Sequence, residues 1–302
     1  MTGFEFYGRT VDTLHVEVSS QCNLQCPMCP RMDGDRPNPN LEEGQLSLEQ
    51  FQDAVPPDYV ALLKHLYFCG NYGDPAMARD LLPIIRYLRL HNPNLLIGMH
   101  SNGSLRSPKW WRELIQAFGG PHYLIFSVDG LEDTNELYRV RSTWPKIMEN
   151  AQAAIDAGGN CHWHYLIFEH NKHQVDDAEV LAKQMGFNEF QRKQTLRQLV
   201  FKRPTLKPGD MSRYEANTAK STDPVICQAQ RERSAYLSAK GQFYPCCYLG
   251  DQAMMVKPRT DVDYNDNRLM NRMPLKPDCD VCTDKCRSIG GRNVTERQYI
   301  TE

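Results

Sequence analysis

Apolar and amphipathic stretches alternate along the first two thirds of the chain. Short apolar runs predict six β-strands, at residues 13–18, 65–68, 95–99, 123–126, 163–168 and 190–199. Between them, apolar residues at helical spacing predict helices at residues 47–54, 78–90, 110–118, 145–157 and 176–185. Strands separated by helices of this length favour βαβ units and a parallel sheet, so the predicted fold class is α/β.

Polar residues occupy one face of the last two predicted strands. His162 and His164 share a face of the fifth strand, with aromatic residues on the other. On the sixth strand, one face is formed by Gln191, Lys193, Thr195 and Arg197. Because helices normally cover the outer face of such a sheet, we expect these residues to face an inner cavity. His164 and Lys193 are therefore candidate catalytic residues and Arg197 is a candidate substrate contact; packed core histidines are the alternative.

Three cysteines lie close together directly after the first predicted strand. Cys22, Cys26 and Cys29 are separated by three and by two residues, and Pro27 and Pro30 argue against a helix here. Thiolates are soft ligands that favour iron–sulfur clusters, zinc or copper(I). Three thiolates on a four-iron cluster leave one iron with the open position that a catalytic metal needs. A zinc knuckle that lacks one ligand and three unrelated thiols are the alternatives.

This loop resembles the signature of the radical S-adenosylmethionine (radical SAM) superfamily, in which three cysteines have the same spacing. The superfamily usually has an aromatic residue before the third cysteine; here Met28 takes that place and offers an apolar contact to adenine. The resemblance implies a partial, TIM-like (β/α)6 barrel, which fits six strands better than a complete eight-stranded barrel does. It also implies a 4Fe-4S cluster at Cys22, Cys26 and Cys29 that binds S-adenosylmethionine.

Polar loops follow several predicted strands, at the end where functional groups gather in such folds. Taken singly, each of these loops is only a turn signal. Placed after the cysteine loop, Gly73-Asp74-Pro75 resembles the Gly-Glu-Pro element of the superfamily, which receives the methionine amino group, with Asp in place of Glu. Ser127 and Asp129 match positions that commonly hold the ribose. After the third strand, Ser101 and Asn102 are further candidate cofactor contacts.

An arginine is expected near the methionine carboxylate, because a guanidinium offers a carboxylate two parallel hydrogen bonds. Arg141-Ser142 resembles the Arg-Gly pair of the superfamily, and Arg141 is therefore the predicted contact. Arg139 is close enough in sequence to be the alternative. A solvated helix residue is the other interpretation of either arginine.

A second set of cysteines follows a Pro-, Lys- and Ser-containing connecting segment. Its members are Cys227, Cys246, Cys247, Cys279, Cys282 and Cys286. A predicted hairpin at residues 234–244 turns at Gly241, and the Cys227…Gly241…Cys246 pattern resembles the SPASM/twitch extension of radical SAM enzymes. The resemblance implies one auxiliary 4Fe-4S cluster. Its predicted ligands are Cys227, Cys246, Cys279 and Cys282, with Cys286 as the substitute. From spacing alone, a four-cysteine zinc site is an equal rival.

Three cysteines remain outside both predicted ligand sets. Cys69 and Cys161 are expected to be buried and to behave as small hydrophobic residues. Cys247 is either an incidental thiol or a hydrogen-atom donor of the kind that some radical epimerases use, and in the second case it is catalytic. The expected domains are a barrel at residues 1–200, a connecting segment at 201–226 and a small cysteine-rich auxiliary-cluster domain at 227–302.

Composition limits which cellular compartment and which binding partners are expected. The chain has 302 residues, 41% of them hydrophobic, a net charge of −2 and no basic block, which makes nucleic acid an unlikely partner. Eleven cysteines without a signal peptide or a membrane-spanning apolar run favour metal ligation in the cytoplasm over disulfides. A flavodoxin- or ferredoxin-type protein is the expected reductant, and no membrane is expected.

The expected activity follows from the resemblance. Such an enzyme cleaves S-adenosylmethionine reductively, and the resulting 5′-deoxyadenosyl radical abstracts hydrogen from a substrate C–H bond. The barrel begins almost at the N-terminus, which leaves no room for a leader-peptide domain and favours oxidation of a small polar metabolite. The auxiliary cluster would accept the electron or anchor the substrate. The alternatives are a maturase of a ribosomal peptide or protein (crosslinking, epimerisation or side-chain oxidation) and a non-catalytic iron–sulfur or zinc scaffold.

Overall fold

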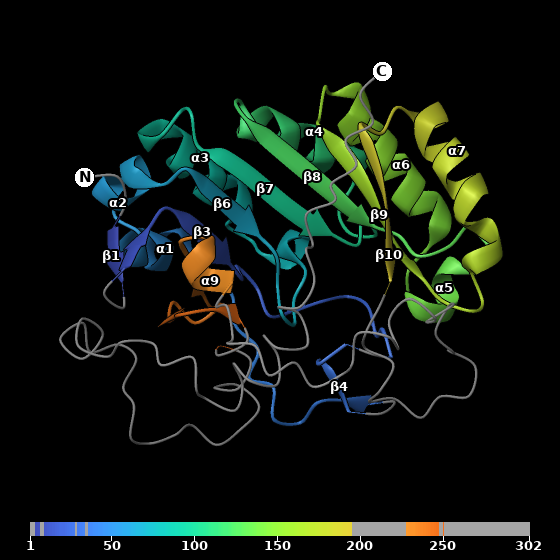
Figure 1. Cartoon of the computed structure of the whole chain (residues 1–302), viewed down its shortest axis with the longest axis horizontal. Coiled ribbons are helices and arrows are strands. Elements are labelled where there is room, and N and C mark those ends of the chain that lie inside the picture. Colours follow the sequence, from blue (N-terminus) through green and yellow to red (C-terminus); the bar gives the residue numbers. More distant parts are fainter. Residues whose placement is uncertain are drawn as a thin grey trace.

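One mostly parallel sheet of eight strands contains most of the strands of the described chain (Figure 1). This computed structural model describes residues 4–6, 9–27, 29–33, 36–194, 228–247 and 250. In spatial order the strands are β10 (Glu189–Gln194), β9 (Cys161–Ile167), β8 (His122–Ser127), β7 (Leu96–Ser101), β6 (His65–Phe68), β3 (Thr13–Val16), β11 (Ser234–Leu237) and β12 (Phe243–Tyr244). The first six of these are parallel neighbours, and they confirm the predicted TIM-like partial barrel.

Helices follow most of these strands and cover one face of the sheet (Figure 1). They are α1 (Leu48–Ala54), α2 (Pro57–Leu62), α3 (Leu81–His91), α4 (Pro108–Phe118), α5 (Asn135–Tyr138), α6 (Trp144–Asp156), α7 (Val175–Met185) and α9 (Gln228–Arg231). Short 3-10 turns are η1 (Pro75–Met77) and η2 (Lys172–Gln174). Two small antiparallel ribbons are formed by β1 (Phe4–Phe6) with β2 (Arg9–Val11) and by β4 (Met32–Asp33) with β5 (Arg36–Pro37). Within the described residues, no helix combines the length and apolar character needed to cross a bilayer.

Two of the five predicted helices, α1 and α4, begin at a side-chain cap. Ser47 and Gln50 form a reciprocal capping box at the start of α1, which confirms the predicted helix start. Ser107 caps α4, whose C-terminus is closed by Gly119 in the left-handed conformation, with φ +53°. The short helices α2 and α5 were not predicted, because six or fewer residues carry too little periodicity to be recognised.

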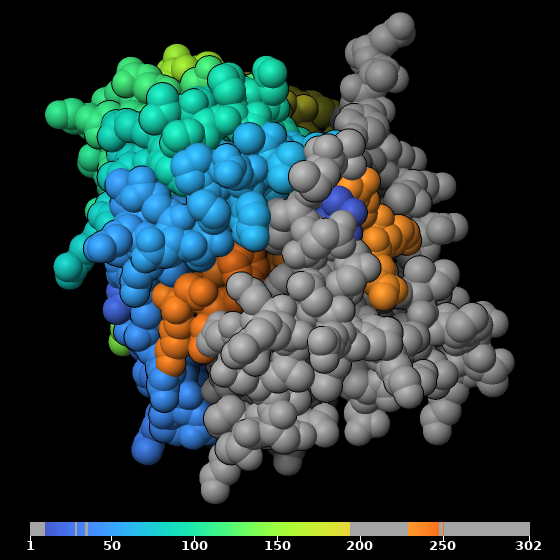
Figure 2. All heavy atoms as spheres, turned by 90° about the vertical axis from the view of Figure 1, so that its left-hand side faces the viewer, coloured from blue at the N-terminus to red at the C-terminus, as the bar shows by residue number. Residues whose placement is uncertain are grey.

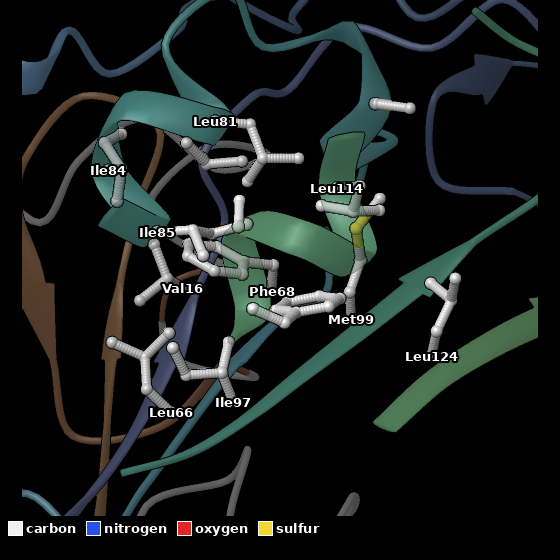
Figure 3. Close-up of a cluster of buried hydrophobic side chains, with 14 of the residues drawn as sticks. Val16, Leu66, Phe68, Leu81, Ile84, Ile85, Ile97, Met99, Leu114 and Leu124 are labelled. Carbon is white, nitrogen blue, oxygen red and sulfur yellow. The ribbon is translucent and has the colours of Figure 1, made fainter. Parts of the chain in front are cut away.

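Alternate residues of the strands form the core between sheet and helices (Figure 3). From the sheet come Val16, Leu66, Phe68, Ile97, Met99 and Leu124, and from the helices Leu81, Ile84, Ile85 and Leu114. All ten are fully buried. The opposite face of the sheet is polar and aromatic: His15, Tyr67, His100, Tyr123 and His164 form a chain of ring contacts across β3, β6, β7, β8 and β9. We call this the inner face, and it confirms the predicted orientation of His164.

The hairpin β11–β12 adds to the first strand of the barrel. β11 pairs in parallel with β3, with Tyr236 opposite His15, and β12 pairs antiparallel with β11. Figure 2 shows atoms of this segment, in orange, seated among those of the N-terminal third. The hairpin is therefore part of the barrel sheet rather than of a separate layer. The boundaries predicted at residues 200 and 227 lie outside the described residues and stay predictions.

Candidate functional site

The cysteine loop lies directly after β3, at the carboxyl end of the parallel strands. The amide of Asp74 donates to the carbonyl of Gln21 (2.8 Å), and the amide of Gln25 donates to the carbonyl of Val140 (3.1 Å). These two bonds fasten the loop to the segments that follow β6 and α5. Within the loop, the amide of Cys29 donates to the carbonyl of Cys26 (3.0 Å), which forms a tight turn. Met28 lies outside the described residues.

The environment of Cys22 and Cys26 is dry and would hold their thiolates only with a compensating cation. Cys26 is 7% exposed, and Cys22 and Cys29 are half-buried. Burial raises the pKa of Cys22 to about 12, with the Asp74 charge adding to the effect. Burial also raises the pKa of Cys26 to about 11, although Arg139 opposes that shift. A metal centre bound by these sulfurs would reverse the preference, since metal binding deprotonates its thiol ligands.

Amide side chains connect this loop to the one that follows β7. Asn102 directs its Nδ2 toward the sulfur of Cys22 (3.7 Å) and donates to Oδ1 of Asn23 (3.1 Å). Asn23 donates in turn to the hydroxyl of Ser104 (2.8 Å), and Ser104 donates through its backbone and hydroxyl to Asn102 (2.8 and 2.6 Å). Asn102 was predicted as a cofactor contact. Its position also suits a donor to a cysteine sulfur, which lowers the basicity of a thiolate ligand.

Asp74 fixes the Gly73-Asp74-Pro75 loop to the same place. Its carboxylate, 4% exposed, accepts hydrogen bonds from the hydroxyl of Ser101 (2.9 and 3.1 Å), the amide of Asn102 (2.8 Å) and the amide of Ala76 (2.9 Å). Burial raises the pKa of Asp74, and these hydrogen bonds oppose the shift. The carboxylate therefore positions the two loops after β6 and β7, and its oxygens already have protein donors.

Glu17 is a site residue that was not predicted. It extends the apolar run of β3, is fully buried, and accepts at Oε1 from the amides of Tyr72 (2.8 Å) and Gly73 (3.0 Å). The hydroxyl of Tyr236 in β11 donates to Oε2. One carboxylate thus holds the loop after β6 and the C-terminal hairpin together. The available signal was a glutamate within an otherwise apolar strand, because a buried charge needs several donors.

A buried ion pair closes the other side of the loop. Nε of Arg139 lies 2.6 Å from Oδ2 of Asp129, and Oδ1 of Asp129 accepts from the amide of Leu166 in β9 (2.7 Å). The guanidinium also lies over the ring of Tyr138, at 5.2 Å, and Tyr138 packs with Cys26 and Phe168. Although burial opposes it, the Asp129 charge beside the guanidinium raises the pKa of Arg139.

Two other predicted contacts lie at the edge of this arrangement. Arg141 is exposed, with its backbone in the left-handed region (φ +74°). Ser127 is half-buried at the end of β8. Of the two candidate arginines, the structure brings Arg139 to the cysteine loop, and the role of Arg141 stays a prediction.

Two candidate catalytic residues lie further down the inner face. In register, Lys193 on β10 is opposite Leu166 of β9, and Gln191 is opposite His164. Burial lowers the pKa of Lys193, and burial followed by the Lys193 charge lowers the pKa of His164 to about 2. Among the described residues, the Lys193 ammonium has no ion-pair or hydrogen-bond partner. Arg197 lies outside the described residues.

The C-terminal cysteines are described only in part. Cys246 and Cys247 follow β12 and are half-buried, and the carbonyl of Cys247 accepts from Nδ2 of Asn71 (2.9 Å) in the loop after β6. Cys227, Cys279, Cys282 and Cys286 lie outside the described residues. The predicted auxiliary cluster therefore stays a prediction. Of the two cysteines expected in the core, Cys161 is fully buried and Cys69 is half-buried.

Comparison with known proteins assigns the family. A sequence profile described as the radical SAM superfamily matches residues 16–181, more than half of the chain. The chain belongs to the radical SAM superfamily. Members of this superfamily are enzymes that bind a 4Fe-4S cluster and S-adenosylmethionine. The donor set fits such a cluster: three thiols in one loop, two of them held in a dry environment, with Asn102 and Arg139 as donors toward their sulfurs.

Several relatives and solved structures are similar to the chain. The tungsten-containing aldehyde ferredoxin oxidoreductase cofactor-modifying protein of Pyrococcus furiosus is 27% identical over 119 residues, which are 39% of this chain and 31% of that protein. SuiB of Streptococcus suis superposes with a TM-score of 0.61 at 10% identity, covering 88% of this chain and 67% of SuiB. anSMEcpe with bound AdoMet gives a TM-score of 0.59 at 16% identity, covering 91% of this chain and 86% of that one. SuiB is also known bound to the precursor peptide SuiA, and anSMEcpe to the Cp18Cys peptide. At these identities the structural likeness shows the fold alone.

Proposed function

We propose that this protein is a radical SAM enzyme that removes a hydrogen atom from a C–H bond of a small polar substrate bound against the inner face. The observation that carries the proposal is one connected set of contacts. The cysteine loop, the Gly73-Asp74-Pro75 loop and the Asn102 loop are joined through Asp74, Asn102 and Glu17 at the carboxyl ends of the strands. Such a set pre-positions a cofactor site before any cofactor binds.

In this proposal Cys22, Cys26 and Cys29 hold a 4Fe-4S cluster. When bound there, the cluster and S-adenosylmethionine would supply reductive cleavage to methionine and a 5′-deoxyadenosyl radical. Asn102 stabilises the Cys22 thiolate, and the Arg139 guanidinium stabilises the Cys26 thiolate, because both are donors toward the sulfurs. Asp74 positions the loop whose backbone receives the methionine amino group, while Ser127, Asp129 and Arg141 remain candidate contacts to the ribose and the carboxylate.

The substrate class is inferred from the inner face. Lys193 offers a half-buried cation without a counter-ion in the described chain, and His100 and His164 are neutral donors or acceptors beside it. A polar substrate with an anionic or hydroxyl-rich group would complement this surface. Because this surface suits a small polar substrate, we favour the oxidation of a small metabolite as the reaction. The C-terminal cysteines Cys227, Cys246, Cys279 and Cys282, with Cys286 as substitute, are the proposed ligands of an auxiliary cluster that accepts the electron or anchors the substrate.

A peptide maturase is the second candidate function. It is favoured by the two superposed enzymes whose structures hold peptides, SuiB and anSMEcpe. Cys247, at the end of the hairpin and close to Tyr67 on the inner face, would then be the candidate hydrogen-atom donor. Adding small polar metabolites or short peptides separates the two functions: the correct class raises 5′-deoxyadenosine formation above the rate seen without substrate.

The proposal is tested on anaerobically reconstituted protein with dithionite and S-adenosylmethionine. We expect about eight irons per chain and formation of 5′-deoxyadenosine. The triple variant C22A/C26A/C29A should lose about four irons and all 5′-deoxyadenosine. Cys161→Ala is the matched control, because it removes a core thiol away from the loop and should change neither measurement. A wild-type protein that carries both clusters and makes no 5′-deoxyadenosine with any substrate would support the scaffold alternative.

A further inference from the structure

A group of potential metal ligands lies on the inner face, toward the amino ends of β9 and β10, whereas the cysteine loop lies at the carboxyl end of the sheet. His162 and His164 are alternate residues of β9, and Glu189 lies opposite His162 in the parallel register. One ligand atom from each of the three lies within 4.8 Å of the others. None of these residues has a role in the radical SAM chemistry proposed above except His164, which was a candidate for the substrate side.

The hydrogen bonds around His162 turn its Nδ1 atom toward the carboxylate of Glu189. Nδ2 of Asn160 donates to the carbonyl of His122 (3.1 Å), so Oδ1 of Asn160 faces Nε2 of His162 (3.0 Å). In a neutral imidazole the proton then lies on Nε2, and Nδ1 presents a lone pair to Oε2 of Glu189 at 3.4 Å. Two acceptors at this distance need a cation between them, which is either a second proton on the ring or a metal ion.

His164 supplies the second observation. It is 9% exposed, yet among the described residues its ring makes no hydrogen bond. Its two ring nitrogens are therefore available to an ion, and an unprotonated imidazole nitrogen is a common metal ligand.

We propose that His162, His164 and Glu189 form a binding site for a single divalent transition metal ion, such as Zn²⁺, on the inner face of the barrel. Two imidazoles and one carboxylate are a donor set that zinc and non-haem iron use, with positions left open for water or substrate. Ligand atoms of a tetrahedral site with bonds of about 2.1 Å lie about 3.4 Å apart, which is the separation of His162 Nδ1 and Glu189 Oε2.

The surroundings of the site support this geometry. Asn160 holds the other nitrogen of His162, which is the usual outer contact of a ligating histidine. The ring of Tyr123 stacks on His162, with 6.0 Å between centroids and 18° between planes. Glu189 keeps 36% of its side chain exposed, which leaves an entry path for the ion.

The test uses the full-length protein with its clusters reconstituted anaerobically, supplied with one equivalent of Zn²⁺ and then desalted. We expect about one retained zinc per chain, with X-ray absorption at the zinc edge showing nitrogen and oxygen ligands at about 2.0–2.1 Å. His164→Asn and Glu189→Gln should each weaken zinc binding by tenfold or more. His173→Asn, which changes an exposed histidine in η2, is the matched control and should bind zinc as the wild type does.

Three outcomes would overturn the proposal. The first is zinc bound only through sulfur at about 2.3 Å, which would place it on the cysteines. The second is no retained zinc, which would leave His162 and Glu189 as an ion pair. The third is nitrogen-ligated zinc that is unchanged in His164→Asn. The wild-type spectrum decides the matter even if a variant fails to fold. Because the readout is zinc ligation, loss of 5′-deoxyadenosine formation with this zinc signal intact would contradict only the proposed function.

Discussion

Arg139 donates from Nε to the carboxylate of Asp129 at 2.6 Å, and no part of that carboxylate side chain is exposed. The pair joins the short helix α5 to the ends of β8 and β9, beside the sulfur of Cys26. Each charge compensates the other in a region where an unpaired charge would be expelled into solvent. The geometry of the cysteine loop therefore depends on an ion pair that lies outside the loop.

Asp129→Asn should lower the free energy of unfolding by about 3–5 kcal/mol, because it leaves a buried guanidinium without its counter-charge. Chemical denaturation under anaerobic conditions measures this. Asp176→Asn is the control, since it removes an exposed carboxylate from Arg192 and should cost less than about 1 kcal/mol. Equal effects of the two substitutions would show that the Arg139–Asp129 pair is not a stabilising contact.

Glu17→Gln and Tyr236→Phe should both destabilise the protein, because Glu17 receives donors from the Gly73 loop and from the hairpin. The glutamine amide would face either the Tyr236 hydroxyl or the amides of Tyr72 and Gly73, and one of these donors would be left without an acceptor. We expect losses of about 1–3 kcal/mol in each case. Tyr244→Phe is the control, since that hydroxyl donates to Oε1 of Gln242, two residues away in the same hairpin. A comparable loss in this variant would contradict the specific role of Glu17.

Gly73→Ala should disrupt the candidate cofactor site. A Cβ atom at this position would lie 1.7 Å from the carbonyl oxygen of Ser19, so the Gly73 loop or the segment before Cys22 must move. We expect a loss of stability of about 3 kcal/mol and reduced iron content after reconstitution. Gly158→Ala tests the alternative that any glycine substitution has this effect. Gly158 also has a positive φ, but a Cβ atom added there would have no other atom within 4 Å, so the iron content of this variant should be normal.

His15 should make the protein less stable as the pH falls. Burial lowers its pKa to about 4, whereas a histidine in the unfolded chain has a pKa of about 6.5. The unfolded state binds more protons between these values, so stability rises with pH through this range. From pH 8 to pH 6 this histidine alone should cost about 0.8 kcal/mol. That part of the pH dependence should disappear in His15→Gln, whose amide can still donate to the carbonyl of Cys69.

Denaturation curves at pH 6, 8 and 9 check this. Between pH 8 and pH 9 the two proteins should show the same change in stability, because His15 is neutral in both the folded and the unfolded state there. If the variant keeps the whole wild-type change between pH 8 and pH 6, His15 is not the titrating group.

Local patterns were sufficient for the parallel strands and the longer helices. The periodicity of β9, for example, correctly predicted that His164 and the aromatic residues of that strand lie on opposite faces. The partner of the hairpin could not be predicted, because the pairing of β11 with β3 is a contact between segments far apart in sequence, and neither segment carries a signal for the other. Glu17 was missed for the same reason: its donors come from the β6 loop and from β11.

The choice between the two arginines shows another limit. The sequence pattern favoured Arg141, with Arg139 as the alternative. The turn after α5, with Arg141 at positive φ, directs Arg139 inward and Arg141 to the surface. The Gly73-Asp74-Pro75 element was expected to receive the methionine amino group, and this stays a prediction. The sequence did not indicate that the Asp74 oxygens also bond to Ser101, Asn102 and Ala76. A sequence motif identifies the loop, but only the three-dimensional structure shows which groups donate hydrogen bonds to its carboxylate.

The pairing of β11 with β3 also has a consequence for biosynthesis. The first strand of the barrel is bordered on one side by a strand that leaves the ribosome much later; the hydroxyl of Tyr236 and the carboxylate of Glu17 are 219 residues apart along the chain. Until that late segment emerges, β3 is an open sheet edge, and such edges recruit other chains. Nascent chains of this protein should therefore depend on chaperones until residue 237 has been translated, and truncation before the hairpin should produce aggregates rather than a smaller barrel.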